Sequence, residues 1–526
     1  MPNLSARESW GTRFGLIFAV AGNAIGLGNF LRFPVQAAEN GGGSFMIPYI
    51  IAFLLIGIPL MWMEWTIGRY GGRYGHGTTP GMFARLWNHP AAKYLGVLGL
   101  IIPFIVLTYY VFIESWTFAY SVFSLTGLFG DYMVVNGGSS SELSLMKDFL
   151  LGYTGQQHDP FFWGIGMAAI FLGITLVANF WILYKGLSGG IEWFAKWALP
   201  TLFIFAIILV IRIFTLDQIP GSNGTVWQGL GYIWNPDYSR LGDVNVWLAA
   251  AGQIFFTLSV GMGTIHTYAS YLRSKEDIAL NGLATGMTNE FAEIVLGVCI
   301  AIPVAVLFFG LSETITIAQG GSFNLGFVSM SVIFNHIEFG PFFGFIWFFL
   351  LFFAGITSSV AMGQPIVTFL QEELKWSHRK SVTALLVLTV GCVIPVLLFS
   401  QYGYLDELDF WAGTFLLVLF GTIECILLAW VFGMDKTWAE MNLGAAITIP
   451  RIFYFIIKWV TPLFLIALLA VWFFNSAWGI LIFANEDNPD KIAAAIGARL
   501  FIVVIFVAFS FLVYRSWKSG THRELK

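Results

Sequence analysis

Charged residues are scarce in this chain. Only 11% of its 526 residues are Asp, Glu, Lys or Arg, whereas 57% are hydrophobic, and a soluble protein usually carries about a quarter charged residues. The mean hydropathy is +0.77. These values exclude a soluble globular fold. They predict an all-α membrane protein, because a helix satisfies its own backbone hydrogen bonds in lipid.

The chain also has little cysteine and none of the common catalytic motifs. Its three cysteines, Cys299, Cys392 and Cys425, show neither metal-ligand spacing nor a disulfide framework, and we interpret them as small apolar residues within helices. There is no Gly-rich loop followed by Lys, no His-Glu-x-x-His motif and no Ser nucleophile elbow. An enzyme is therefore not expected, and no segment is long enough for a nucleotide-binding domain that would drive a pump.

About twelve apolar runs are present, each close to the roughly 20 residues that cross a bilayer. They cover 12–37, 43–68, 94–124, 161–184, 194–214, 244–270, 279–309, 340–370, 381–399, 408–433, 450–475 and 494–515. About 19 of the 26 Lys and Arg residues fall in the set of connections that includes the N-terminus. Because cytoplasmic loops carry the excess of Lys and Arg, both termini are predicted to be cytoplasmic.

Two of these runs are interrupted by glycine. The first contains Gly22-Asn-Ala-Ile-Gly-Leu-Gly-Asn29, and the sixth contains Ser259, Gly261 and Gly263. Broken backbone at membrane depth survives only where it is buried in protein or lines a polar cavity. Each broken run opens a block of five spans, a pattern typical of the inverted repeats of secondary transporters. We therefore expect a binding site near the midplane, between the two breaks.

Polar side chains cluster in the runs around these breaks, where they are costly. They are Asn23, Asn29, Thr257, Ser259, Asn289, Glu293, Thr357 and Ser358. Neutral amide, carbonyl and hydroxyl oxygens suit sodium, whereas calcium would require several carboxylates. Backbone amides at the break could face an anionic group of a substrate. The alternative is that the hydroxyls bond back to their own helices and serve packing alone.

A long stretch of the first run carries a specific family resemblance. The segment Ala21-Gly-Asn-Ala-Ile-Gly-Leu-Gly-Asn-Phe-Leu-Arg-Phe-Pro34, followed by Glu39-Asn-Gly-Gly-Gly43, resembles the first-span signature of neurotransmitter:sodium symporters. The similarity extends from Trp10 to the twelfth run and includes Gly68-Arg-Tyr-Gly-Gly72, Tyr109-Tyr110, Glu114-Ser-Trp116, Phe255-Phe-Thr-Leu-Ser259 and Phe410-Trp-Ala-Gly413.

The resemblance implies a single transporter domain over 1–526. Repeat one would cover about 10–214, repeat two about 243–433, and two accessory helices about 450–515. Helices one and six would be broken. The resemblance also implies two sodium ions as the only cofactors.

The resemblance further implies the residues of each site. The first sodium ion would be bound by Ala24, Asn29, Thr257 and Asn289, and the second by Gly22, Ile25, Ala354, Thr357 and Ser358. The substrate would contact Asn23, Ala24, Gly26, Leu27, Gly28, Val106, Tyr110, Phe256, Thr257, Ser259, Met262, Ser358 and Met362.

Two gates are implied on either side of this site. Arg32 and Asp409 would close the outer side, with Tyr110 and Phe256 as a lid beneath them. The inner gate would consist of Arg7, Trp10, Ser270, Tyr271 and Glu372. Glu372 stands where the family has Asp, so the charge is kept but the geometry differs.

Four positions refine the expected function. Gly26 stands where monoamine-transporting relatives carry Asp, which favours a substrate that brings its own carboxylate. Glu293 stands where chloride-dependent relatives have Ser, so chloride independence is expected, with Tyr49, Gln253, Thr257 and Asn289 around the carboxylate. Met262 and Met362 would form an adaptable apolar wall.

The sequence thus predicts sodium-coupled symport of neutral, hydrophobic L-amino acids by alternating access. The expected location is the plasma (inner) membrane of a prokaryote. A proton-coupled amino-acid transporter and a sensor that binds amino acids without transporting them remain as alternatives. The expected partners are a small-molecule amino acid and the lipid bilayer, with a homodimer left open and no nucleic acid.

Overall fold

The computed structural model describes residues 10–137, 141–484 and 486–519. Within these ranges, ten helical stretches are long and apolar enough to span a membrane. They are Gly43–Arg73, Ala92–Thr126, Gly166–Tyr184, Leu187–Phe214, Ile278–Phe309, Gly340–Leu374, His378–Tyr402, Tyr404–Met441, Ile452–Leu481 and Pro489–Lys518. The predicted all-α membrane fold is confirmed, with small shifts at the ends of the runs.

The first and sixth runs differ from the others because both are broken. Helix α1 (Arg13–Ala24) and the stretch Gly28–Glu39, which includes α2 (Phe33–Glu39), meet at an angle of 47°. The sixth run is divided into α13 (Val244–Leu258) and α14 (Thr264–Ala269). Neither half of the sixth run reaches spanning length by itself. Within the described residues, ten continuous helices are long enough to span a membrane, and the bent pair of the first run makes an eleventh. About twelve runs were predicted, and the sixth falls outside this count because it is divided into two short helices.

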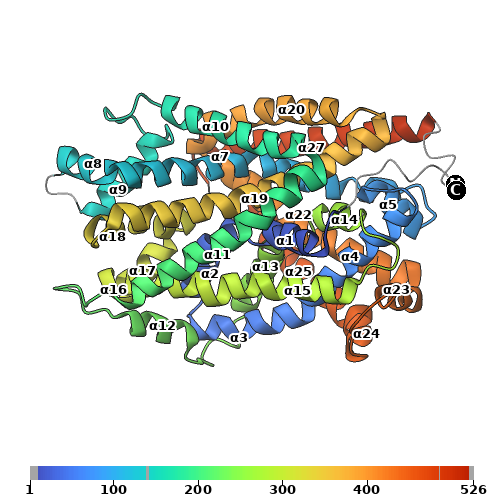
Figure 1. Cartoon of the computed structure of the whole chain (residues 1–526), viewed down its shortest axis with the longest axis horizontal. Coiled ribbons are helices and arrows are strands. Elements are labelled where there is room, and N and C mark those ends of the chain that lie inside the picture. Colours follow the sequence, from blue (N-terminus) through green and yellow to red (C-terminus); the bar gives the residue numbers. More distant parts are fainter. Residues whose placement is uncertain (1–9, 138–140, 485, 520–526) are drawn as a thin grey trace.

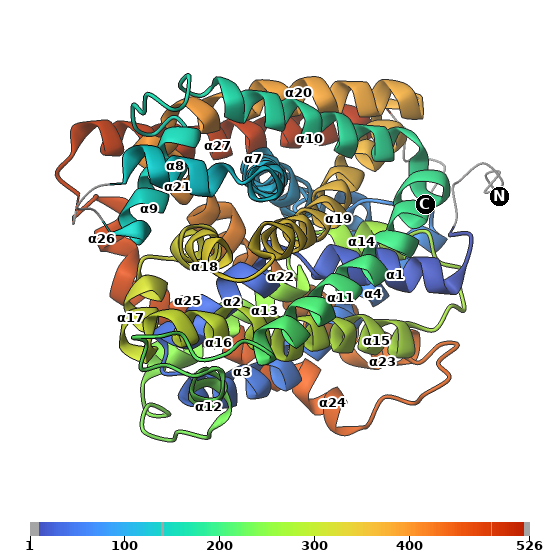
Figure 2. The same cartoon turned by 60° about the vertical axis from the view of Figure 1, so that its left-hand side comes forward.

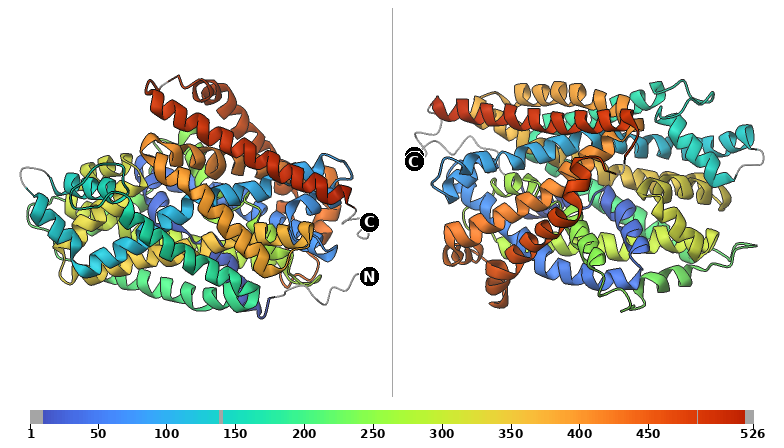
Figure 3. Two further views of the ribbon diagram at one scale, coloured as in Figure 1. Left: turned by 90° about the horizontal axis from the view of Figure 1, so that it is seen from above. Right: turned by 180° about the vertical axis from the view of Figure 1, so that it is seen from behind.

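The two breaks lie inside the bundle, beside its most buried helices (Figure 1). In the apolar windows of the spans that contain α7 (Leu98–Thr126) and α19 (Gly340–Leu374), 94% and 89% of the residues are buried. In contrast, only 17% are buried in α27 (Pro489–Lys518). Figure 3 shows α27 along the outside of the bundle. The centre is thus protein-lined, whereas α27 presents a largely apolar surface to lipid.

Short helices cover the two ends of the bundle. Helices α8 (Leu128–Asn136), α9 (Glu142–Tyr153), α12 (Val226–Trp234), α17 (Leu311–Gln319) and α18 (Met330–His336) lie toward one end. Helices α5 (Thr79–Leu86) and α23 (Met434–Met441) lie at the other (Figures 1 and 2). The second end contains the connections that are rich in Lys and Arg.

A buried arginine forms polar contacts with several chain segments at this second end. Arg69, near the end of α4 (Ile58–Arg73), has no exposed side-chain surface and forms a salt bridge of 2.9 Å with Glu440. It also donates to the carbonyls of Glu276 (2.5 Å) and Leu443 (2.8 Å). A guanidinium has five donors in a fixed geometry, so this one side chain satisfies carbonyls from two loops.

Glycine is needed at the sixth-run break for both conformation and space. Gly263 has φ of +84°, which side chains other than Gly rarely adopt, and a Cβ there would lie 2.1 Å from the carbonyl oxygen of Gly99. Gly261 has φ of +73°, and its Cβ would lie 2.4 Å from the carbonyl oxygen of Leu417. The break thus packs directly on backbone of α7 and α22 (Leu416–Cys425).

We predict that Gly263→Ala destabilises the protein by roughly 1–3 kcal/mol, because Ala must adopt the left-handed region and displace the Gly99 carbonyl. Gly252→Ala in α13 is the matched control, since a Cβ there meets nothing within 4 Å and Ala favours a helix by roughly 1 kcal/mol over Gly. Thermal unfolding of the detergent-purified proteins measures both changes. A Gly263→Ala variant as stable as the wild type would contradict this packing.

Candidate functional site

A small cavity lies where the two breaks meet α7 and α19. It has a volume of about 20 Å³ and is lined by Ala24, Gly26, Gly28, Asn29, Val106, Tyr110, Phe256, Ser259, Met262, Ser358 and Met362. All of these except Asn29 belong to the predicted substrate contacts. Segments that are far apart in the sequence thus converge on one enclosed space between the breaks.

The remaining three predicted substrate contacts do not line this cavity and make other contacts. Asn23 donates to Thr264 Oγ1 (3.1 Å), so its side chain links α1 to α14. Leu27 lines a second cavity on the outer side. Thr257 faces the first predicted sodium site, as described below.

Serine hydroxyls hold the two breaks together. Ser259 and Ser358 both donate to the carbonyl of Asn23, each at 3.1 Å. Ser259 itself has φ of +53°, in the left-handed region. The backbone N–H of Leu27 donates to the hydroxyl of Tyr110 (3.1 Å), and that of Gly26 donates to Asn29 Oδ1 (2.8 Å). Side chains thus satisfy backbone groups that the helix no longer pairs.

Gly26 is a position of very close approach. A Cβ at this residue would lie 2.9 Å from both Ser358 Oγ and Tyr110 Oη. Similarly, a Cβ at Gly28 would lie 2.5 Å from the ring of Phe256. In this conformation, a side-chain carboxylate at position 26 has no room.

The four predicted ligands of the first sodium ion lie together. Asn29 Nδ2 is 3.0 Å from Thr257 Oγ1 and 2.8 Å from Asn289 Oδ1. The Ala24 carbonyl oxygen lies 3.2 Å from the Asn289 amide. Asn29 and Asn289 are fully buried. Neutral polar groups from four segments therefore lie together beside the cavity, with the amide nitrogen of Asn29 toward Thr257 and Asn289 and its Oδ1 on the Gly26 N–H.

Glu293 lies directly against this group. Its carboxylate accepts from Asn29 Nδ2 (2.9 Å), Gln253 Nε2 (2.9 Å) and Tyr49 Oη (3.0 Å), and also contacts the hydroxyl of Thr257. Tyr49, Gln253 and Thr257 are three of the four neighbours that we predicted. Asn289, the fourth, contacts Asn29, which itself donates to Glu293.

A second buried carboxylate was not predicted. Glu290 accepts from the hydroxyl of Tyr49 (2.9 Å), so the two acids share one donor. The sequence held a signal for it, because Glu290 and Glu293 are three residues apart and such residues lie on the same side of a helix.

The residues predicted for the second sodium ion form another group, between α1 and α19. Ser358 Oγ lies 3.4 Å from the Gly22 carbonyl and 3.2 Å from the Ala354 carbonyl. Thr357 Oγ1 donates to the Ala354 carbonyl (3.1 Å), and a Cβ on Gly22 would lie 3.2 Å from Thr357 Cβ. Ile25 caps α1 next to them. Gly22 thus allows the close contact of the two helices.

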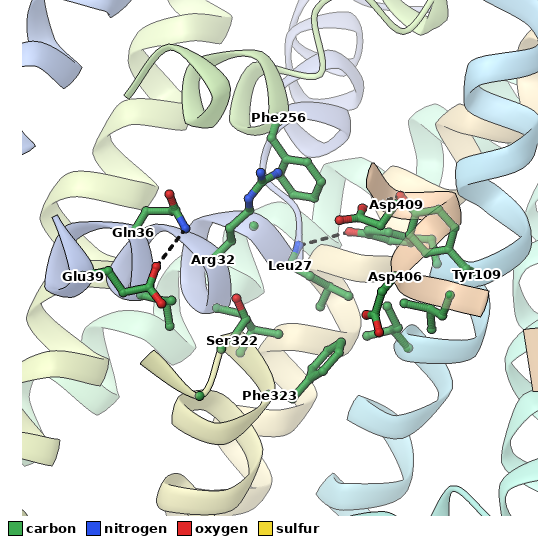
Figure 4. Close-up of a pocket in the computed structure, with 18 residues that line it drawn as sticks. Leu27, Arg32, Gln36, Glu39, Tyr109, Phe256, Ser322, Phe323, Asp406 and Asp409 are labelled. Carbon is green, nitrogen blue, oxygen red and sulfur yellow. Dashed lines mark hydrogen bonds between the residues drawn. The ribbon is translucent and has the colours of Figure 1, made fainter. Parts of the chain in front are cut away.

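The outer side of the site opens into a larger cavity of about 360 Å³. Arg32 and Asp409 both line it, but within the described residues they form no salt bridge. The Arg32 guanidinium lies 4.4 Å from the ring centroid of Phe256, whereas Asp409 accepts from Tyr109 Oη (2.7 Å) (Figure 4). The two predicted gate residues therefore face one cavity, each bound to an aromatic neighbour.

The connection from Ser312 to Phe339 contributes to this outer cavity. After α17, residues Gly320, Gly321, Ser322 and Phe323 line its wall. This part of the connection therefore dips toward the cavity and is not only a surface loop.

The predicted inner gate is partly described. Arg7 lies outside the described residues. Trp10 Nε1 donates to the Tyr268 carbonyl (3.1 Å), and Ser270 Oγ donates to the Thr267 carbonyl (2.7 Å). Tyr271 Oη forms a hydrogen bond with Thr368 Oγ1 (2.9 Å). Glu372 accepts from the N–H of Gly77 (2.7 Å). Trp10 and Tyr271 line a common cavity of about 250 Å³ at this end.

Comparison with known proteins gives a consistent result. A model of the sodium:neurotransmitter symporter family matches residues 7–131 and 140–519. A sodium-dependent transporter of Methanocaldococcus jannaschii is 31% identical over 464 residues, which is 88% of this chain and 89% of the relative. A sodium-dependent transporter of Haemophilus influenzae is 28% identical, covering 89% of this chain and 98% of the relative.

The fold also has a counterpart among solved structures. MhsT in complex with L-phenylalanine superimposes with a TM-score of 0.74 at 27% identity, over 88% of this chain and 99% of that chain. With the family match over nearly all of its length, this chain belongs to the sodium:neurotransmitter symporter family and is a sodium-dependent transporter of the membrane.

Proposed function

We propose that the protein couples sodium entry to the uptake of neutral, hydrophobic L-amino acids by alternating access. The observation that carries this proposal is the group formed by Asn29, Thr257 and Asn289. Asn29 contacts both other residues and also lines the small cavity between the breaks. An ion bound by these oxygens would lie beside the substrate, so that each offsets the charge of the other.

The surroundings of Gly26 support an amino acid as the substrate. An amine would need a carboxylate from the protein, and the space next to Gly26 is filled by Ser358 and Tyr110. The N–H of Leu27 donates to the hydroxyl of Tyr110 at the break, and both groups would suit the carboxylate of an amino acid. MhsT, whose fold this chain shares, was crystallised with L-phenylalanine.

The other walls of the cavity favour an apolar side chain. Val106, Phe256, Met262 and Met362 line it and are apolar. Methionine is unbranched and flexible, so these two residues would adapt to substrates of different shape. The preference would include Leu and Met and extend to aromatic amino acids.

Glu293 supports transport that does not need chloride. Its carboxylate contacts Asn29 and Thr257, two ligands of the proposed first sodium ion. A fixed carboxylate at this point would supply the negative charge that a chloride ion supplies in relatives with Ser.

A second sodium ion would bind to Gly22, Ile25, Ala354, Thr357 and Ser358. Ser358 also lines the small cavity, so this ion would link α1 to α19 next to the substrate. Two ions moved with a zwitterion would gain roughly 4.6 kcal/mol per 100 mV of membrane potential. That gain is enough to concentrate the substrate on the order of a thousandfold.

Access would alternate between the outer cavity and the cavity at Trp10. Arg32 and Asp409, which now face one cavity, would pair when the outer side closes. We place the protein in the plasma membrane of a prokaryote with both termini in the cytoplasm, in line with the distribution of Lys and Arg.

The central test is uptake into proteoliposomes. An inward sodium gradient should drive accumulation of leucine, whereas a proton gradient without sodium should not. Asn29→Ala should weaken the apparent sodium affinity about tenfold or more, because losing one ligand costs at least about 1.4 kcal/mol. Asn136→Ala, at an exposed position of α8, should leave it unchanged. Binding without accumulation would point to a sensor, and uptake without sodium to a proton-coupled carrier.

A further prediction concerns the chloride dependence of uptake. Replacing chloride with gluconate should leave wild-type uptake unchanged, whereas Glu293→Ser should make uptake depend on chloride because the fixed charge is lost. Glu142→Ser, half exposed on the surface, should behave like the wild type. The idea fails if the wild type loses uptake without chloride at saturating sodium.

Another prediction concerns the selectivity among amino acids. In competition with labelled leucine, Met and Phe should compete strongly and Gly and Ala weakly. The side chain of Leu has three more carbons than Ala, worth ~0.8 kcal/mol each when buried, so the expected difference in affinity is on the order of fiftyfold. A protein that accepts only Gly and Ala would contradict an apolar cavity that adapts to large side chains.

A further inference from the structure

Two glutamates and a histidine form a buried cluster that the proposed transport does not use. Glu64 of α4, His266 of α14 and Glu424 of α22 have no exposed side-chain surface, and none of them lines the substrate cavity. Helix α4 packs against both α14 and α22 (Figure 1). In the part of the chain that the structure describes, this is the one group of three His, Cys, Asp or Glu side chains gathered closely enough to hold a metal ion.

The imidazole lies between the two carboxylates. His266 Nε2 is 3.0 Å from Glu424 Oε1, and His266 Nδ1 is 3.5 Å from Glu64 Oε2. One ligand atom from each of the three residues lies within 4.8 Å of the other two. Two acids from different helices therefore face one ring.

These contacts leave most of the polar atoms unpaired. Neither ring nitrogen of His266, neither oxygen of Glu424 and not Glu64 Oε2 has a hydrogen-bond partner. The other oxygen of Glu64 accepts from the N–H of Gly261 (2.5 Å). Buried carboxylates without donors are costly, above all within a membrane span. The cluster therefore needs a positive partner.

The geometry at His266 suits a metal ion better than a direct hydrogen bond. Nε2 is close enough to Glu424 Oε1 for such a bond, so the bond is missing because the ring nitrogen is not aimed at the oxygen. When a nitrogen and an oxygen bind one zinc ion tetrahedrally, each at about 2.0–2.2 Å, they lie roughly 3.4 Å apart. The oxygen then lies off the axis of the ring nitrogen, as it does here.

The charge and the donor types indicate which class of ion would fit. Two carboxylates and a neutral imidazole carry two negative charges, which one divalent cation offsets. Calcium takes six to eight oxygen ligands, whereas three ligands that include an imidazole are typical of zinc and similar transition metals.

We propose that Glu64, His266 and Glu424 bind a divalent transition-metal ion of the zinc class. His266 would bind it through one ring nitrogen and each glutamate through one oxygen, and the unpaired second oxygen of Glu424 would be the next ligand available. The ion would join α14, the second half of the sixth run, to α4 and α22. Because Glu64 also accepts the N–H of Gly261, the ion would hold the break itself in place.

The test measures the metal content of the protein, which depends on neither the proposed substrate nor sodium. Protein from zinc-supplemented cells is purified, washed with EDTA to remove ions from its surface, and analysed by inductively coupled plasma mass spectrometry. The wild type should retain close to one zinc ion per chain. Treatment with phenanthroline should remove the ion and lower the melting temperature, and added zinc should restore it.

H266Q and E424Q each remove a ligand but nearly keep the size of the side chain. Both should reduce zinc affinity about tenfold or more, the upper loss being typical of groups that only support a ligand. H336Q is the matched control, because His336 is exposed and lies 2.6 Å from Glu142, a surface pair that zinc could also bind. It should keep the wild-type metal content.

The wild-type measurement decides the matter even if H266Q and E424Q fail to fold. A wild type without bound metal, whose melting temperature responds to neither phenanthroline nor zinc, would overturn the proposal and leave protons as the positive partners. Loss of zinc in H336Q with retention in H266Q would overturn it too, since the ion would then lie on the surface. Zinc in a protein that takes up no leucine would count against the proposed function alone.

Discussion

The structure depends on one constraint: backbone that leaves the helix at membrane depth must find partners within the protein. Helices α1 and α13 both end inside the bundle, and the side chains around them supply the missing hydrogen bonds. Asn29 and Tyr110 accept the amides of Gly26 and Leu27. Ser259 and Ser358 both donate to the Asn23 carbonyl. Asn29, Tyr110, Ser259 and Ser358 hydrogen-bond the unpaired backbone at the breaks and also line the cavity. The stability of the fold and the shape of the cavity therefore depend on the same contacts.

The second constraint is charge in a medium that solvates it poorly. Glu293 and Glu290 are buried, and each shares donors from neighbouring helices, so that neither carboxylate is left without a hydrogen bond. A cation bound by Asn29, Thr257 and Asn289 would lie next to this negative charge. The ion and the acid would therefore stabilise each other. The same reasoning applies to the zwitterionic substrate, whose carboxylate would face the ion and the amides of the break.

Much of this arrangement could be predicted from the sequence because it rests on local chemistry. Low charge and about twelve apolar runs predicted the helical membrane fold, and the glycines of the first and sixth runs predicted the two breaks. The polar residues near them predicted that buried polar groups would gather beside the breaks. The contacts of Gly26 could not be predicted in this way. Its closeness to Ser358 and Tyr110 joins three helices that are distant in the sequence, and only their packing shows that position 26 has no room for a carboxylate.

The sequence by itself determined the class of structure and the position of the breaks, because hydropathy and glycine content act within a single helix. The tertiary structure decided which of these residues meet. It paired Arg32 with Phe256 and Asp409 with Tyr109 around one cavity, where the sequence suggested a direct pair. It brought Glu290 to Tyr49 and placed His266 between Glu64 and Glu424, which belong to two other helices. Such contacts depend on the angles and depths at which helices pack, and these are set by the whole bundle rather than by any one of its segments.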